Sequence, residues 1–415
     1  MTALVGVFNK RGAAIAADSA MTVSVDGNTK IYNNEQKIFP LSDKNPVGVM
    51  ICNNLNFFTT PWALIFELYR ASNGDKKFSA LTGYLEDFIE FISSMKSLQS
   101  KEEKWIYYRN VFNNLLEVFR TVFSDKCDKE LDKEHVFPDD ELSRVCYAHT
   151  FDLLKTAIYE DDVLPPFKAF SLENFYEEVI KPNKEFFEEK RTLFQRMEDN
   201  EWDVLLQFFH RSLINDDFNQ PLASEIIFVG YGEDDIFPAS QRLYISGMVG
   251  AGIKYKIEEI SKITHSLSAE IRPFAQTDVM FTLMKGVSPQ SDQEYRDATI
   301  ELEEGIIDDI SQLLENEKVS PKIIKKIEKL SYEKVHERYV ERIDTFVQEN
   351  FISGVVNALE SFNLEEMAKM SENLIAVTNL QRHISSSEES VGGPIEVAVI
   401  TKTGGFKWIK HDILI

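Results

Sequence analysis

The stretch Met1-Thr2-Ala3-Leu4-Val5-Gly6-Val7-Phe8, followed by Gly12-Ala13-Ala14-Ile15-Ala16-Ala17-Asp18-Ser19, decides the fold of this chain. Its two apolar runs, 3–8 and 13–18, flank a polar turn that contains Gly12. Such a pattern is typical of a hairpin of two buried strands. The chain therefore opens with the beginning of a sheet.

Thr2 precedes the first of these strands. The initiator methionine is normally removed before a small residue such as threonine, so we expect Thr2 to become N-terminal. An N-terminal threonine carries a hydroxyl nucleophile and an α-amino group, whose ordinary pKa of about 7.7–8.0 leaves a useful neutral fraction. One residue then supplies both nucleophile and base, without a histidine.

Length and composition set the class of protein. The chain has 415 residues, of which 43% are hydrophobic, enough for one large core or two smaller ones. No apolar run is long enough to span a bilayer, and no basic segment precedes a long apolar one as in a signal peptide. The three cysteines, Cys52, Cys127 and Cys146, are too few and too scattered for a disulfide framework. We expect a soluble, cytoplasmic protein that does not bind membranes.

The charge is strongly acidic. The 68 acidic residues outnumber the 45 basic ones and give a formal net charge of −23. A surface of this sign repels phosphate backbones, which argues against nucleic-acid binding. The acidity serves solubility or, alternatively, attracts basic substrates or partners.

Periodicity places strands at the start, middle and end of the chain, with helices between them. Strands are expected over 3–8, 13–18, 47–52, 225–232, 241–248, within 253–272, and over 395–401 and 406–409. Helices are expected from about 60, over 79–95, throughout 96–222, and over 274–286, 292–316, 321–350 and 364–384. Strand pairs separated by helical hairpins favour an α+β layered fold, with sheet packed on sheet and helices outside.

Together these pieces resemble an N-terminal-nucleophile (Ntn) hydrolase of the proteasome β-subunit type, to which the core of the bacterial two-component ATP-dependent protease is related. The matching motifs are the Thr2–Gly6 start, the Ala16-Ala17-Asp18-Ser19 run, Lys37 before the Gly48-Val49-Met50 strand, and a C-terminal helix that leads into Gly392-Gly393. The resemblance implies a four-layer αββα sandwich with added helical insertions. It divides the chain into core segments 1–95, 224–288 and 359–415 and helical insertions 96–223 and 289–358.

The resemblance also implies catalytic roles. Thr2 Oγ would attack a carbonyl carbon while the free amine shuttles the proton through a water. Lys37 would lie close to Thr2, where its charge lowers the pKa of the hydroxyl and the amine. Asp18 would pair with Lys37 and orient it. Taken singly, Lys37 is better explained as a surface strand residue and Asp18 as a turn or cap residue, whereas the two together behind a strand-initial Thr2 favour the catalytic roles. Replacing Lys37 by Ala is expected to abolish most Thr2 reactivity with little loss of stability.

Further site residues match the family imperfectly. The oxyanion donor would be a backbone N–H at Cys52 or Asn53, where the family has a Gly-Gly pair and this chain has Cys52-Asn53-Asn54. Asp278 would stand near the Thr2 amine or simply occupy a first helical turn. Glu388 would replace the family's acid, and Ser390 its serine if the register slips by one.

Met21, Val23 and Met50 would surround a substrate side chain, although plain core packing explains them as well. No pair of histidines four residues apart and no Cys-x-x-Cys is present, so we expect neither a metal nor a cofactor.

The leading hypothesis is therefore a threonine peptidase. A small-amide acylase or amidase on the same fold and a catalytically inactive scaffold or assembly protein are the alternatives. Expected partners are a polypeptide or small-amide substrate, further copies of the chain, and an unfoldase or adaptor bound through the helical insertions.

Overall fold

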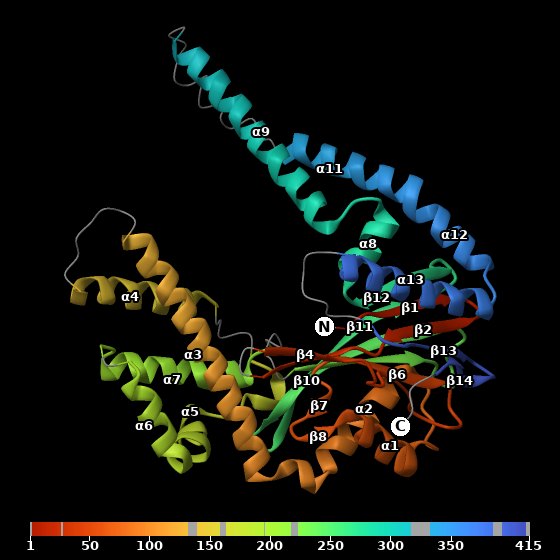
Figure 1. The fold of residues 1–415 in the computed structure, drawn as a ribbon, viewed down its shortest axis with the longest axis horizontal. Helices are drawn as coiled ribbons and strands as arrows, with labels where there is room; N and C mark the ends of the chain where they lie inside the picture. The colour runs from red at the N-terminus through yellow and green to blue at the C-terminus, as the bar shows by residue number, and fades with distance from the viewer. Residues whose placement is uncertain are drawn as a thin grey trace. The chain divides into compact units, whose positions relative to one another are not determined.

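The computed structural model describes residues 2–25, 28–131, 139–157, 163–194, 196–216, 223–316, 333–384 and 392–411 (Figure 1). The chain forms two compact units. The first unit consists of 1–38, 236–238 and 261–415, and the second of 39–235 and 239–260. Both combine helices with antiparallel strand pairs, so the chain has the expected α+β character.

The first unit is built on a five-stranded sheet. Its order is β12 (Ala269–Ala275), β1 (Leu4–Asn9), β2 (Gly12–Asp18), β13 (Ile395–Thr401) and β14 (Gly405–Lys410). Every neighbouring pair is antiparallel. β1 and β2 form the expected hairpin, and every residue of both strands is buried. Burial on both faces explains why these strands are apolar, except at their last residues Asn9 and Asp18, instead of alternating.

Helices cover this sheet. α13 (Leu364–Ile384) packs against β1, β2 and β13, and α12 (Ser353–Ser361) packs against β12 and β1 (Figure 1). Met367, Leu374 and Ile375 of α13 enter one core with Val5 and Val7 of β1. The small side chains of β2, from Ala13 to Ala17, allow the helix to approach the strand closely.

Three further helices belong to the first unit. α8 (Thr277–Lys285) follows β12, α9 (Pro289–Asn316) follows α8, and α11 (Glu333–Val347) contacts α9 and continues through the turn Gln348–Ile352 into α12. β3 (Met21–Val25) and β4 (Asn28–Tyr32) pair as a separate short hairpin.

The second sheet has the order β11 (Gly252–Lys262), β10 (Ala239–Val249), β9 (Ser224–Gly230), β6 (Val47–Asn53) and β5 (Ile38–Pro40). α1 (Trp62–Asn73) and α2 (Leu81–Ser94) pack on one of its faces. Trp62, Phe66 and Phe88 stack there, with ring centroids of Phe66 and Phe88 5.5 Å apart. β7 (Asn56–Phe57) and β8 (Thr60–Pro61) form a small hairpin before α1.

The aromatic-rich segment after α2 folds into helices of the second unit. They are α3 (Lys101–Leu131), α4 (Asp139–Ala157), α5 (Leu172–Phe175), α6 (Lys184–Thr192) and α7 (Asp199–Ile214). Short 3₁₀-helical segments lie at Lys96–Gln99, Pro165–Phe167 and Lys181–Asn183, and a π-helical segment lies at Tyr176–Ile180. Phe112, Phe187 and Phe209 meet in their common core. Tyr107 of α3 packs on Gly247 of β10, where an added Cβ would meet the ring at 2.6 Å.

The sequence predicts the helix 364–384 and the strand 395–401 at their observed bounds, and the strands expected over 47–52, 225–232 and 241–248 to within a few residues of β6, β9 and β10. It does not predict β3, β4, β5, β7, β8 or α12, nor the bounds of the separate helices within 96–222. The helix expected over 321–350 is observed from Glu333, and residues 317–332 lie outside the described part of the chain. Across the described ranges, every helix is too short or too polar to cross a bilayer.

Candidate functional site

Asp18, the last residue of β2, is the centre of a buried polar group in the first unit. Its Oδ1 accepts hydrogen bonds from the Lys37 ammonium at 2.9 Å and from the backbone N–H of Ala3 at 2.8 Å. Its Oδ2 accepts from the backbone N–H groups of Gly392 at 3.1 Å and Ala20 at 3.3 Å. Four donors therefore converge on this one carboxylate, two on each of its oxygens.

Lys37 is fully buried, at 0% exposure. Besides the bond to Asp18, its Nζ donates to the backbone carbonyl of Ala20 at 2.5 Å. A buried ammonium is tolerated only when it is paired and hydrogen-bonded. The interpretation of Lys37 as a surface strand residue is therefore wrong, and the pairing with Asp18 implied by the resemblance is present.

The residue after Thr2 is fixed to Asp18 at two points. Ala3 donates its N–H to Asp18 Oδ1, and the N–H of Asp18 donates to the Ala3 carbonyl at 3.2 Å. Thr2 itself is partly buried and stands directly before this clamp. The structure therefore brings the backbone next to Thr2 and the Lys37 ammonium to the same carboxylate oxygen.

The Gly392-Gly393 pair, which precedes β13, completes the buried polar group around Asp18. The Gly392 carbonyl accepts the N–H of Ser19 at 3.2 Å. Gly393 has a φ of +74°, and a Cβ there would run into Ser19 Oγ and lie 2.9 Å from the carbonyl of Asn33. Glycine is needed at this position for both reasons.

Glu396 is a site residue that sequence reasoning missed. It is fully buried in β13, and its Oε2 accepts the backbone N–H of Lys37 at 3.0 Å while its Oε1 lies 2.8 Å from Nδ1 of His411. Burial raises the pKa of Glu396, against the opposing effects of the Lys37 amide and His411. An acid within the apolar run Ile395–Ile400 is the signal that could have revealed it.

Of the accessory residues Asp278, Glu388 and Ser390, only Asp278 lies in the described part of the chain. Asp278 lies in the first turn of α8, about half exposed, where Arg382 of α13 donates to its Oδ1 at 2.5 Å. This ion pair fits the alternative of a first-turn helix residue. Glu388 and Ser390 lie outside the described residues.

Cys52, Asn53 and Met50 belong to β6 in the second unit. Asn53 has a φ of +66°, in the left-handed region, and its Nδ2 donates to Oε1 of Glu225 at 2.7 Å. Asparagine adopts this conformation more readily than most residues, so the backbone conformation that favours glycine is kept without one. Cys52 and Met50 are buried in the strand.

Two of the expected pocket residues lie in β3 of the first unit. Met21 is partly buried, and the side chain of Val23 lies outside the described part of the structure. A role for Met21, Val23 and Met50 in substrate binding stays a prediction.

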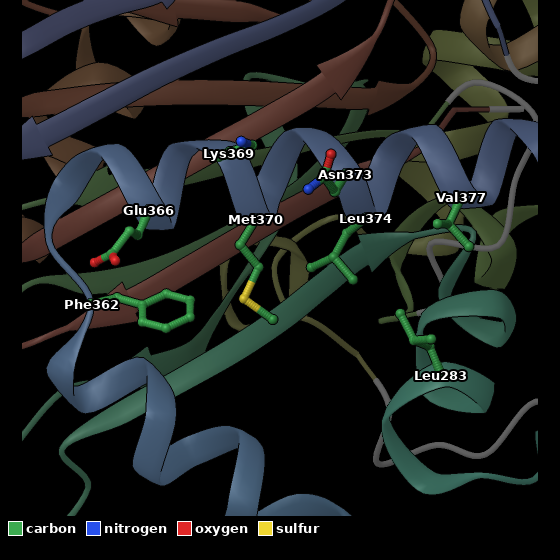
Figure 2. A pocket seen from close by; sticks show the side chains of 8 residues that line it. All are labelled: Leu283, Phe362, Glu366, Lys369, Met370, Asn373, Leu374 and Val377. Atoms are coloured by element: carbon green, nitrogen blue, oxygen red, sulfur yellow. The ribbon is translucent and has the colours of Figure 1, made fainter.

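A separate cavity of about 420 Å³ lies beside α8 and α13 (Figure 2). Met370, Leu374 and Val377 project from α13 toward it, and Leu283 reaches it from α8. Its lining contains no serine, threonine, cysteine or histidine, so it offers no hydroxyl or thiol nucleophile of its own. Within the described ranges, no three His, Cys, Asp or Glu side chains converge as a metal site.

The chain matches no protein-family profile and no curated protein sequence. A similar solved structure is the Anbu (Gly-1) mutant from Hyphomicrobium sp. strain MC1, with 9% sequence identity and a TM-score of 0.28. The match covers 99% of this chain and 88% of that one. A likeness of this size supports no conclusion about the activity of this chain.

Proposed function

We propose that this chain is an N-terminal threonine hydrolase of the Ntn type, which cleaves amide bonds, and peptide bonds above all, once Met1 has been removed. One observation carries the proposal: Asp18 Oδ1 binds both the Lys37 ammonium and the backbone N–H of the residue that follows Thr2. A cation is thereby held next to the backbone of an N-terminal nucleophile.

The chemistry divides between Thr2 and Lys37. Thr2 Oγ attacks the carbonyl carbon of the substrate, its proton passes through a water to the α-amine, and the amine then protonates the leaving nitrogen. The fixed Lys37 charge stabilises the negative charge that develops during attack. Water releases the acyl group from Thr2 in a second step.

The remaining parts of the proposal rest on the sequence resemblance. They are the four-layer αββα arrangement, the insertions 96–223 and 289–358, and assembly of several copies with an unfoldase or adaptor. The accessory roles proposed are oxyanion binding by Cys52 or Asn53, substrate binding by Met21, Val23 and Met50, and support of the Thr2 amine by Asp278, Glu388 and Ser390.

Hydrolysis of small amides is a second candidate, favoured by Asn53. The side chain of Asn53 is held by Glu225 at the position where the family has glycine. In the site that the sequence resemblance implies, its Cβ and amide would crowd a long peptide but leave room for a compact acyl group. Asn53→Gly is then expected to raise the turnover of peptides relative to small amides, whereas an unchanged ratio argues against crowding by Asn53.

Purified full-length chain should be compared with Thr2→Ala and Thr2→Ser on fluorogenic peptides and small amides. We expect Thr2→Ala to lose turnover completely with an unchanged circular dichroism spectrum and oligomeric state, and Thr2→Ser to keep part of it. Equal turnover by wild type and Thr2→Ala contradicts the proposal. A wild-type chain that retains Met1 and turns over nothing indicates the inactive scaffold.

A further inference from the structure

Two of the three cysteines meet across a helix pair of the second unit. Cys127 of α3 and Cys146 of α4 are 19 positions apart in sequence, and their Sγ atoms are 2.9 Å apart. The helices that carry them pack against each other. A disulfide requires an S–S distance of about 2.05 Å, which small side-chain rotations reach from this arrangement. The third cysteine, Cys52, is buried in β6.

The two thiols differ in access. Cys146 is fully buried beside Tyr147, whose ring lies 4.7 Å from that of Phe123. Cys127 is only partly buried. Burial, with the neighbouring Cys127 sulfur as second cause, raises the pKa of Cys146 to about 12. A reagent in solution therefore meets Cys127 first.

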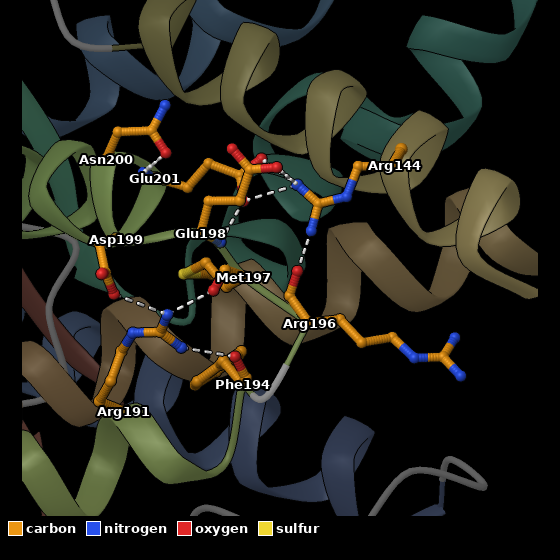
Figure 3. A network of polar contacts seen from close by, with 9 residues as sticks. All are labelled: Arg144, Arg191, Phe194, Arg196, Met197, Glu198, Asp199, Asn200 and Glu201. Carbon is orange, nitrogen blue, oxygen red and sulfur yellow. Dashed lines mark hydrogen bonds and ion pairs between the residues drawn. The ribbon is translucent and has the colours of Figure 1, made fainter.

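Both helices are also held by polar contacts to other segments. Arg144 of α4 donates to the carboxylates of Glu198 and Glu201 at 3.1 Å and to the carbonyl of Arg196 (Figure 3). Arg196 precedes α7, Glu198 is its N-cap, and Glu201 lies in its first turn. At the other end of the bundle, Lys104 of α3 donates to the carbonyl of Gly250 at 2.6 Å. The separation of the thiols is thus set by the packing of the whole helical segment and not by one mobile side chain.

We propose that Cys127 and Cys146 form a redox-reversible disulfide site that reacts with small-molecule disulfides. The Cys127 thiolate attacks one sulfur of the reagent, which releases one small thiol and leaves a mixed disulfide on Cys127. The Cys146 sulfur then attacks Cys127 Sγ, and its proton passes to the departing thiolate, which leaves as the second small thiol. The protein loses two protons and two electrons, and the reagent gains both.

The bond would tie α3 to α4 and close the segment between them. Cross-linking restricts the unfolded chain more than the folded one, so the oxidised protein is expected to unfold at a temperature higher by about 5 °C. Because both sulfurs already touch, the native packing changes little. In a reducing compartment such a bond is transient, so we infer a reversible modification and not a permanent structural disulfide.

The test uses full-length protein incubated with oxidised glutathione, followed by thiol titration after unfolding and by non-reducing peptide mapping. We expect accessible thiols to fall from three to one, a mass loss of two hydrogens without a glutathione adduct, and a cross-linked peptide pair containing Cys127 and Cys146. Dithiothreitol should restore all three thiols.

Cys52→Ser serves as the matched control and should form the same cross-link, leaving no free thiol. Cys127→Ser and Cys127→Ala, at a partly exposed position, should fold and form no cross-link. Three persistent thiols in the wild type, a stable glutathione adduct at Cys127 without a cross-link, or a cross-link to Cys52 would each overturn the proposal.

Discussion

Lys37 Nζ lies 2.9 Å from Asp18 Oδ1, and both side chains are completely buried. The same oxygen binds the N–H of Ala3, so a single carboxylate connects the Lys37 ammonium to the backbone beside Thr2. A buried ion pair is weak evidence for stability, because desolvation offsets much of the attraction. We therefore attribute the Asp18–Lys37 pair to its effect at the start of β1, where the Lys37 ammonium places a positive charge.

Removing Lys37 should cost stability as well as activity. Lys37→Met leaves the Asp18 carboxylate buried without its cation, and such changes cost about 3–5 kcal/mol. This replaces the sequence-based expectation of little loss, because Lys37 is fully buried. Urea unfolding measures the change. Lys44→Met, which breaks the exposed ion pair with Asp75, should cost less than about 1 kcal/mol. Equal losses for Lys37→Met and Lys44→Met would contradict this account of the burial.

Asp18 and Lys37 should also be energetically coupled. The double variant Asp18→Asn/Lys37→Met buries no unpaired charge, so it should be more stable than the sum of the two single losses implies, by at least about 1 kcal/mol. Purely additive losses in a double-mutant cycle would mean that the pair does not act as a unit. Activity of the double variant should remain at the level of Lys37→Met, since the cation is absent from both.

Gly393 and Gly405 provide a matched pair of glycines. Both have a positive φ, +74° and +68°, so alanine is strained at either position by about 1 kcal/mol. Only at Gly393 would the added Cβ also clash, with Ser19 Oγ and the carbonyl of Asn33, whereas nothing lies within 4 Å at Gly405. Gly393→Ala should therefore lower the urea midpoint clearly more than Gly405→Ala. The same urea midpoint for both variants would mean that the close approach at Gly393 does not contribute to stability.

Glu396 should make stability depend on pH. Its pKa is raised in the folded state, so the folded chain binds more protons than the unfolded chain between the ordinary value of 4.5 and the raised value. The contribution of Glu396 to the free energy of unfolding therefore falls as pH rises through this window and is constant above it. Glu396→Gln should gain stability relative to wild type from pH 4.5 upward, and the exposed Glu365→Gln should not. Parallel pH curves for wild type and Glu396→Gln would argue against a raised pKa.

The elements that the sequence predicts well have a strong local signal. β1 and β2 are largely apolar runs around a turn, β13 is a further largely apolar run, and α13 places Met367, Leu374 and Ile375 in one core. The β3–β4 hairpin was not predicted, although Met21, Val23 and Val25 alternate with Thr22 and Ser24 as in a half-buried strand. This alternation is the local signal that could have revealed β3.

Only part of the candidate site was predicted from the sequence. The pairing of Asp18 with Lys37 follows from a motif, but the burial of Lys37 depends on Ala20 and on Glu396, which is 359 positions away. The contact between Cys127 and Cys146 depends on how α3 packs on α4. Contacts of this kind are set by tertiary packing, which a single sequence does not display.

The central claim is that Thr2 is the nucleophile. The most direct test treats the purified chain with a β-lactone, which acylates an activated hydroxyl without a leaving group, and maps the adduct by mass spectrometry of the N-terminal peptide. We predict a peptide that begins at Thr2 and carries one acyl group on it, with no labelling of Thr2→Ala. An N-terminal peptide that retains Met1, or a label at another residue that survives in Thr2→Ala, would contradict the claim.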